Sequence, residues 1–323
     1  MHLGQRFLFL ISLALFLFDP SLTAQESPKD SCEIPLVVTR YTQSYASREI
    51  VRDLTPQNID AHPDEEPISV TSIRLDDGPK RLAILLDASK NVPAEEWQLQ
   101  TEMAAKFLEY ARPSDKFSIF LVGVPAPSEP FYSSKAAIER LKKLHKDRPS
   151  ATESGERNYD ALAVAAQSLT PSLFGDSIFF FGHDADEESK TDPAQLTKML
   201  LQNHIRVYAI SFRSPQFPPN FDPNKGVPAF TEGSKLPEIT RASGTFFSYH
   251  DVHVFQMSGQ KQLFENFLGD LFLMVADPYR LTVPVGTSPE PRKLSLSIKD
   301  AKQLRIDKDE VRFPRSIYPC PLS

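Results

Sequence analysis

Short apolar runs alternate with longer amphipathic stretches through the middle of the chain. Residues 81–86, 117–122, 177–181 and 206–212 form nearly continuous apolar runs, which is typical of strands buried on both faces of a sheet. Apolar positions at helical spacing predict helices over 93–111, 134–145, 158–168, 193–203, 236–242 and 260–275. Strands that alternate with helices predict an α/β fold, a doubly wound and mostly parallel sheet.

Both ends of the chain are rich in β-forming residues instead. Residues 36–41 and 68–75 precede the α/β region, and residues 279–283, 292–298 and 311–313 follow it. We expect these flanks to form one small accessory β unit. The expected divisions are a signal peptide at 1–24, an N-terminal β-rich flank at 25–78, the α/β domain at 79–276 and a C-terminal β-rich tail at 277–323.

The first residues have the pattern of a signal peptide. Arg6 is followed by an apolar run at 7–18, a Pro20 breaker and Ala24, after which we expect cleavage. The run is shorter than the roughly 20 residues that span a bilayer, although an uncleaved anchor remains an alternative. No second run of that length follows. We therefore expect an exported chain (periplasm, cell surface or secreted) with no integral membrane span after cleavage.

Two cysteines, Cys32 and Cys320, lie near opposite ends of the chain. In an oxidising compartment such a pair usually forms a bridge, which would join the two β-rich flanks. The alternative is two unrelated buried thiols.

Composition and charge reduce the number of functions that the chain could have. Hydrophobic residues make up 41% of the chain and charged residues 24%, as in ordinary globular proteins. The net charge of −6, with no basic block, argues against nucleic acid as a partner. No Gly-x-Ser-x-Gly, His-Glu-x-x-His or phosphate-loop motif is present, so the sequence favours a binding protein over an enzyme.

The first α/β strand ends in the sequence Leu-Leu-Asp-Ala-Ser-Lys-Asn at 85–91. Doubly wound sheets place their sites at the carboxyl ends of strands, and the oxygen atoms of Asp87 and Ser89 suit a hard cation. Residues 81–276 resemble a von Willebrand factor A domain, whose metal-ion-dependent adhesion site uses an Asp-x-Ser-x-Ser loop. Residues 155–162 resemble its second site segment, and residues 236–247 resemble its late helix and final strand.

The flanking segments are similar to those of one bacterial group. Val37-Val38-Thr39, residues 53–59 and Pro67-Ile68 resemble the region ahead of this domain in exported proteins of Acidobacteria-type bacteria. The resemblance implies a non-enzymatic adhesion or protein-interaction module with a protein partner of unknown identity.

The adhesion-site pattern is degenerate in this chain. Asn91 replaces the second serine, Glu156 takes the threonine position unless a loop shift offers Ser154, and His183 takes the third-segment Asp. Asp184 or Asp186 could substitute if that loop changes register. The candidate metal ligands are Asp87, Ser89, Asn91, Glu156 and Asp184.

The degenerate adhesion-site pattern also limits which metal ion the chain could bind. We expect no resident cofactor. If the site is functional and its ligands are oxygen atoms, Mg²⁺ or Mn²⁺ would fit it better than Zn²⁺. Imidazole is a poor Mg²⁺ ligand, so a site that includes a histidine with carboxylates would instead suit Zn²⁺.

Three alternatives stay open at this stage. Asp87 and Ser89 are more simply explained as caps of the following helix. The acidic run 184–188 has the composition of a solvated loop rather than a calcium site. The rival functions are an exported metal-dependent hydrolase and a structural component of an envelope assembly.

Overall fold

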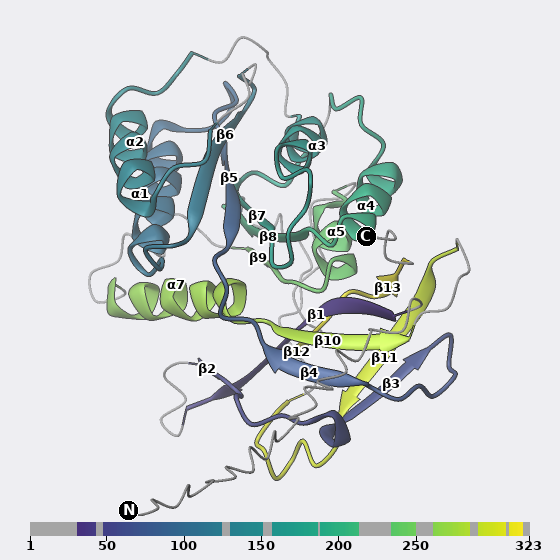
Figure 1. The fold of residues 1–323 in the computed structure, drawn as a ribbon. Coiled ribbons are helices and arrows are strands. Elements are labelled where there is room, and N and C mark those ends of the chain that lie inside the picture. The colour runs from purple at the N-terminus through teal and green to yellow at the C-terminus, as the bar shows by residue number, and fades with distance from the viewer. Residues whose placement is uncertain are drawn as a thin grey trace, which may run out of the picture.

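Two units, an α/β unit and a β unit, lie next to each other in the computed structural model (Figure 1). The structure describes residues 31–42, 48–124, 130–150, 157–186, 188–212, 234–249, 261–284, 290–307 and 310–318. The expected signal peptide and Cys320 lie outside these residues, so the structure does not test them.

The α/β unit is built on a five-stranded parallel sheet. Its strands lie in the order β6-β5-β7-β8-β9. Their bounds are β5 Arg81–Asp87, β6 Lys116–Val122, β7 Ser177–Gly182, β8 Arg206–Ser211 and β9 Phe247–Tyr249. The strand order reverses between β5 and β7, and in doubly wound sheets ligands bind at the carboxyl ends of the strands at such a point.

Helices cover both faces of this sheet, as expected for a doubly wound fold. One face carries α1 Ala94–Glu109, α2 Ser134–Lys146 and α7 Lys261–Ala276, and the other carries α3 Asn158–Ser168, α4 Pro193–Gln202 and α5 Leu236–Ala242. Alternate residues of β5 enter the two cores, with Leu82 and Ile84 on the α1 side and Ala83 and Leu85 on the α3 side. The predicted fold class is confirmed.

The β unit consists of two antiparallel sheets that enclose a third core. One sheet joins β1 Ser31–Tyr41, β2 Arg48–Ile50, β4 Ser72–Leu75, β10 Tyr279–Pro284 and β12 Val311–Arg312. The other joins β3 Ile59–Pro63, β11 Arg292–Ile298 and β13 Ser316–Ile317. Strands from both ends of the chain pair in each sheet, so the two flanks do form one accessory unit, as predicted.

Some β elements differ from their predicted form. The strand expected at 68–75 is limited to β4, and Ile68 forms an isolated bridge with Ala61 instead. The expected turn at 53–59 contains the short helix η1 Pro56–Asn58 and leads into the unpredicted strand β3. These segments form strands because partners distant in sequence complete their hydrogen bonds, which local pattern does not encode.

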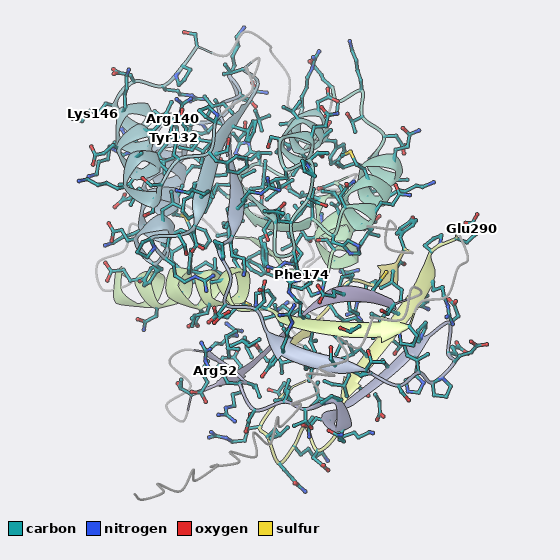
Figure 2. The ribbon with its side chains drawn as sticks, viewed as in Figure 1. Arg52, Tyr132, Arg140, Lys146, Phe174 and Glu290 are labelled. Carbon is teal, nitrogen blue, oxygen red and sulfur yellow. The ribbon has the colours of Figure 1, made fainter. Side chains whose placement is uncertain are left out.

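Two arginines fasten elements near the junction of the two units, one within the α/β unit and one across the junction. The guanidinium of Arg206, 2% exposed, donates to the carbonyl oxygens of Met274 at 3.3 Å and Val275 at 2.9 Å. The Arg280 guanidinium lies 4.1 Å from the centre of the Phe174 ring, where the two units meet (Figure 2). The first contact holds β8 against the end of α7, and the second holds the loop before β7 against β10 of the β unit.

Two aromatic residues, one in α1 and one directly after it, have opposite environments. Trp97 is 2% exposed, and its Nε1 donates to the carbonyl oxygen of Leu144 at 3.0 Å, so it packs between α1 and α2. Tyr110 follows the last helical residue and is 44% exposed, and its hydroxyl donates to the Glu265 carbonyl oxygen.

The β1 strand brings Cys32 close to the end of the chain. Cys32 is 1% exposed, and its Sγ lies 3.6 Å from the carbonyl oxygen of Tyr318, two residues before Cys320. The bridge itself stays a prediction. In the part of the chain that the structure describes, no helix is long and apolar enough to cross a membrane.

Candidate functional site

The carboxyl ends of β5 and β7 meet at the point where the strand order reverses. Asp87 is the last residue of β5 and is fully buried, and Gly182 is the last residue of β7. A Cβ atom on Gly182 would lie 2.3 Å from the Cβ of Asp87. Glycine at 182 therefore leaves the space that the Asp87 side chain fills.

Donors from its own chain occupy the Asp87 carboxylate. Oδ1 accepts hydrogen bonds from the Ser89 amide at 3.0 Å and from the Ser89 hydroxyl, and Oδ2 accepts one from the His183 amide at 3.1 Å. Burial raises the pKa of Asp87, against the opposing effect of the Ser89 hydrogen bonds and the His183 charge. The side chain thus joins the loop after β5 to the loop after β7.

Helix α1 contributes two polar side chains to this region. The Oε1 atom of Gln100 accepts a hydrogen bond from the Asp87 amide at 2.8 Å. Glu96 lies one turn earlier, and its Oε2 is 2.7 Å from Nε2 of His183. His183, at the position expected for a third-segment Asp, therefore faces a carboxylate of α1.

The loop after β5 is fixed by an arginine. The Arg148 guanidinium donates to the carbonyl oxygens of Val92 at 2.7 Å, Ala88 at 3.1 Å and Ser89. It also lies 5.4 Å from the centre of the Trp97 ring. These contacts hold the loop closed against α1.

The helix-capping explanation of Asp87 and Ser89 is wrong. The N-cap of α1 is Pro93, and no side chain caps this helix. The oxygen atoms of Asp87 instead accept donors at residues 89 and 183, because the loop turns back on itself before α1 begins. Asn91 is exposed on the loop.

The acidic run 184–188 was expected to be a solvated loop, but its first residues are buried or half-buried. Asp184 is fully buried, and its Oδ1 accepts a hydrogen bond from the Ser211 hydroxyl at 3.2 Å. Asp186 accepts from the Tyr159 amide at 2.8 Å, and burial raises its pKa. These two carboxylates anchor the loop to β8 and α3.

The arrangement does not fit a metal ion well. Both Asp87 oxygens accept hydrogen bonds, Asp184 faces Ser211, and Glu156 lies outside the described residues. Among the residues that the structure describes, no three His, Cys, Asp or Glu side chains gather as a metal-binding group. The structure therefore brings Asp87 and Ser89 together and leaves Asn91 exposed, and it does not test Glu156.

One oxygen in this region lacks a hydrogen bond within the described chain. Asn158, the first residue of α3, donates its Nδ2 to the carbonyl oxygens of His183 at 2.9 Å and Ala185 at 2.5 Å. Its Oδ1 is buried and has no donor among the described residues. A buried acceptor in this state usually receives a hydrogen bond from water or a ligand.

Sequence reasoning missed Glu96, Gln100, Arg148 and Asn158. A signal for the first two was present, since two polar residues four apart on the buried face of a helix are uncommon. No comparable signal marks Arg148, which lies beyond the end of α2.

No protein-family model matches this chain, and no curated protein matches its sequence. Solved structures with partial similarity include the conserved hypothetical protein BatB from Bacteroides thetaiotaomicron, at 16% identity and a TM-score of 0.43. The alignment covers 61% of this chain and 98% of BatB. An aerotolerance-related membrane protein from Bacteroides fragilis has 17% identity and a TM-score of 0.41, over 58% of this chain and 98% of that one.

A further similar structure is proximal thread matrix protein 1 from the mussel byssus. It has 14% identity and a TM-score of 0.43, and the alignment covers 65% of this chain and 50% of that protein. A second structure of the same protein, at 12% identity and a TM-score of 0.40, has a zinc-occupied MIDAS motif. Similarity at these TM-scores carries no inference about the function of this chain.

Proposed function

We propose that this chain is an exported, non-enzymatic protein-interaction module of the von Willebrand factor A type. Its binding face lies at the carboxyl ends of the parallel strands, around the loops after β5 and β7. The observation that carries the proposal is the hydrogen-bonded junction of Asp87 with Ser89 and His183, which fixes both loops at the switch point of the sheet.

The shape of the β5–α1 loop supports a role in recognition. Arg148 donates hydrogen bonds to its backbone carbonyl oxygens, and the side chains of Lys90 and Asn91 are exposed. A loop fixed in this way loses little conformational entropy when a partner binds. The exposed amide and ammonium groups offer a partner protein hydrogen bonds and charge contacts.

Binding at this face does not require a metal ion in our proposal. In the degenerate loop, Asp87 accepts hydrogen bonds from its own chain, and a metal would have to displace the buried donors of Ser89 and His183. Leaving such donors unpaired costs about 1–3 kcal/mol each. Export is supported by the signal-peptide pattern at residues 1–24.

A pull-down with matched variants tests the proposal. The immobilised chain, lacking residues 1–24, is incubated with solubilised envelope proteins of its native cells in EDTA. We expect one protein to be retained by the wild type and by Lys302→Glu, an exposed control in the β unit, and lost with Asn91→Arg. Enrichment of no protein, or retention that Asn91→Arg leaves unchanged, would contradict the proposed face.

A further inference from the structure

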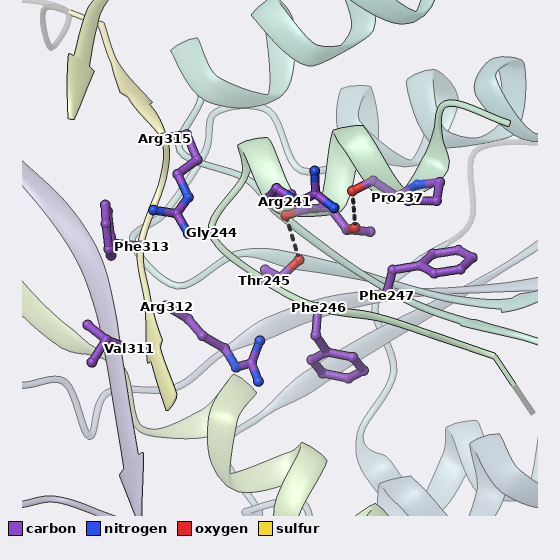
Figure 3. Close-up of a pocket in the computed structure, with 11 residues that line it drawn as sticks. Pro237, Arg241, Gly244, Thr245, Phe246, Phe247, Val311, Arg312, Phe313 and Arg315 are labelled. Atoms are coloured by element: carbon purple, nitrogen blue, oxygen red, sulfur yellow. Dashed lines mark hydrogen bonds between the residues drawn. The ribbon is translucent and has the colours of Figure 1, made fainter. Parts of the chain in front are cut away.

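A second concave site lies at the other end of the sheet, where the α/β unit meets the β unit (Figure 3). It is a pocket of about 300 Å³ formed by the segment from α5 to the start of β9 and by β12 with the residues that follow it. Its lining residues are Pro237, Thr240, Arg241, Gly244, Thr245, Phe246, Phe247, Val311, Arg312, Phe313 and Arg315. Because residues 244–246 precede β9, the pocket lies at the amino end of that parallel strand, away from Asp87.

Close backbone contact makes the walls of this pocket rigid. Gly244 has a φ of +77°, and a Cβ there would lie 2.2 Å from the carbonyl carbon of Phe313. The amide of Arg315 donates to the carbonyl oxygen of Ala242 at 3.0 Å. The Thr245 hydroxyl also donates to the Thr240 carbonyl oxygen at 3.0 Å. The pocket is therefore formed before any ligand enters, as most small-molecule sites are.

The charge of the pocket is positive, whereas the chain as a whole carries −6. Three arginines line it, and no Asp or Glu occurs among its described lining residues. Arg241 and Arg315 are exposed, and neither forms an ion pair with a carboxylate in the described part of the chain. Their guanidinium groups are thus available to an anion from solution.

Aromatic rings accompany two of these arginines. The Arg312 guanidinium lies 5.8 Å from the centre of the Phe246 ring, and that of Arg315 lies 4.6 Å from the centre of the Phe313 ring. Figure 3 shows Arg312 extending toward Phe246 along the pocket. Stacking of this kind orients the planar guanidinium of Arg315 and leaves its edge donors accessible.

We propose that this pocket binds a small organic anion, a carboxylate or phosphate carried on an apolar body. Guanidinium groups bind both anions through paired, charge-assisted hydrogen bonds, which explains the use of arginine rather than lysine. The phenyl rings of Phe246 and Phe247, which are partly exposed and line the pocket, supply apolar surface for the rest of the ligand. The volume of about 300 Å³ suits a molecule at the small end of the usual range for ligand sites. This binding is separate from partner recognition at the Asp87 end.

Isothermal titration calorimetry with four probes tests this site. Benzoate and phenyl phosphate carry the two candidate anions on a ring, inorganic phosphate lacks the ring, and benzyl alcohol lacks the charge. We expect saturable binding of benzoate or phenyl phosphate to the wild type, weaker binding of inorganic phosphate and none of benzyl alcohol. The tighter of the two ring compounds identifies the preferred anion.

Matched variants test whether the probes bind in this pocket. Arg241→Gln combined with Arg315→Gln should weaken binding of the preferred probe by about tenfold or more, because each lost charge-assisted bond is expected to reduce affinity. Lys135→Gln, an exposed residue of α2 on the opposite face of the sheet, removes one positive charge as the control and should change binding less than about twofold. Arg315→Gln alone gives the same test if the double variant does not fold. Failure of both ring compounds to bind at millimolar concentration, or equal loss in Lys135→Gln, would overturn the proposal.

Discussion

The backbone amide of His183 donates a hydrogen bond to Oδ2 of Asp87 over 3.1 Å, which joins the carboxyl ends of β7 and β5. The His183 side chain turns the other way, to Glu96 of α1 at 2.7 Å. One histidine thus connects the central strand, its neighbour and a covering helix through two different groups. Since the Asp87 oxygens are used in this junction, the residue organises the loops of the binding face.

The pH dependence of the unfolding free energy should reveal the raised pKa of the buried Asp87 carboxyl. Burial raises its pKa above 3.8, so the folded chain holds the proton more tightly than the unfolded chain. The contribution of Asp87 to the unfolding free energy therefore falls as the pH rises from about 4 through the raised pKa. Denaturant titrations at several pH values should show that the wild type loses unfolding free energy relative to Asp87→Asn as the pH rises through this window. A difference that grows in favour of the wild type would show a lowered pKa.

Replacement of Gly182 should be strongly destabilising. In Gly182→Ala the new methyl group would lie 2.3 Å from the Asp87 Cβ and 3.0 Å from Phe180, so the strands must shift, at a cost of about 1–3 kcal/mol. Gly269→Ala in α7 is the matched control, because its nearest neighbour lies at 3.4 Å and alanine favours a helix. Thermal melts should show a lower Tm for the first variant and an unchanged or higher Tm for the second. Equal melting temperatures for Gly182→Ala and wild type would mean that β5 and β7 do not approach this closely.

The lone tryptophan reports on packing between α1 and α2. Trp97 is 2% exposed, so its fluorescence should be blue-shifted in the folded chain and move to the red on unfolding. Trp97→Ala should lower the unfolding free energy by about 3–5 kcal/mol. Native emission like that of free indole would contradict the buried position.

A single disulfide should join Cys32 and Cys320 in exported protein. Peptide mapping without reduction should recover one linked pair, because the Cys32 Sγ lies within 3.6 Å of the backbone at Tyr318. Reduction should lower stability by about 2–5 kcal/mol, the usual loss for a native bridge. Two free thiols would contradict the bridge and leave the chain ends held only by strand pairing.

The sequence predicted the strongly patterned elements well. The ranges of α3, α5 and β11 are those expected, since their apolar spacing is regular and their ends carry clear breakers. Strands β2, β3 and β13 were missed, because they have two to five residues and are stabilised by partners far away in the chain.

The sequence predicted where the candidate site lies, but it did not predict the hydrogen bonds that join its residues. The loop 87–91 lies at the switch point, as the strand pattern indicated. The link from Asp87 to His183 depends on the register of β5 against β7, and the link from Glu96 depends on the rotation of α1. Neither quantity follows from local sequence, so the helix-capping explanation could not be corrected before the structure.

The most direct test of the account measures the melting temperature of wild type and Asp87→Ala while Mg²⁺, Mn²⁺ or Zn²⁺ is added. Asp87→Ala should lower the unfolding free energy by about 2 kcal/mol or more, because the buried donors of Ser89 and His183 lose their acceptor. If Asp87 is an internal junction, neither protein gains a saturable increase in Tm with any of the three ions. A saturable increase in the wild type that is absent in Asp87→Ala would contradict the account and make Asp87 a metal ligand.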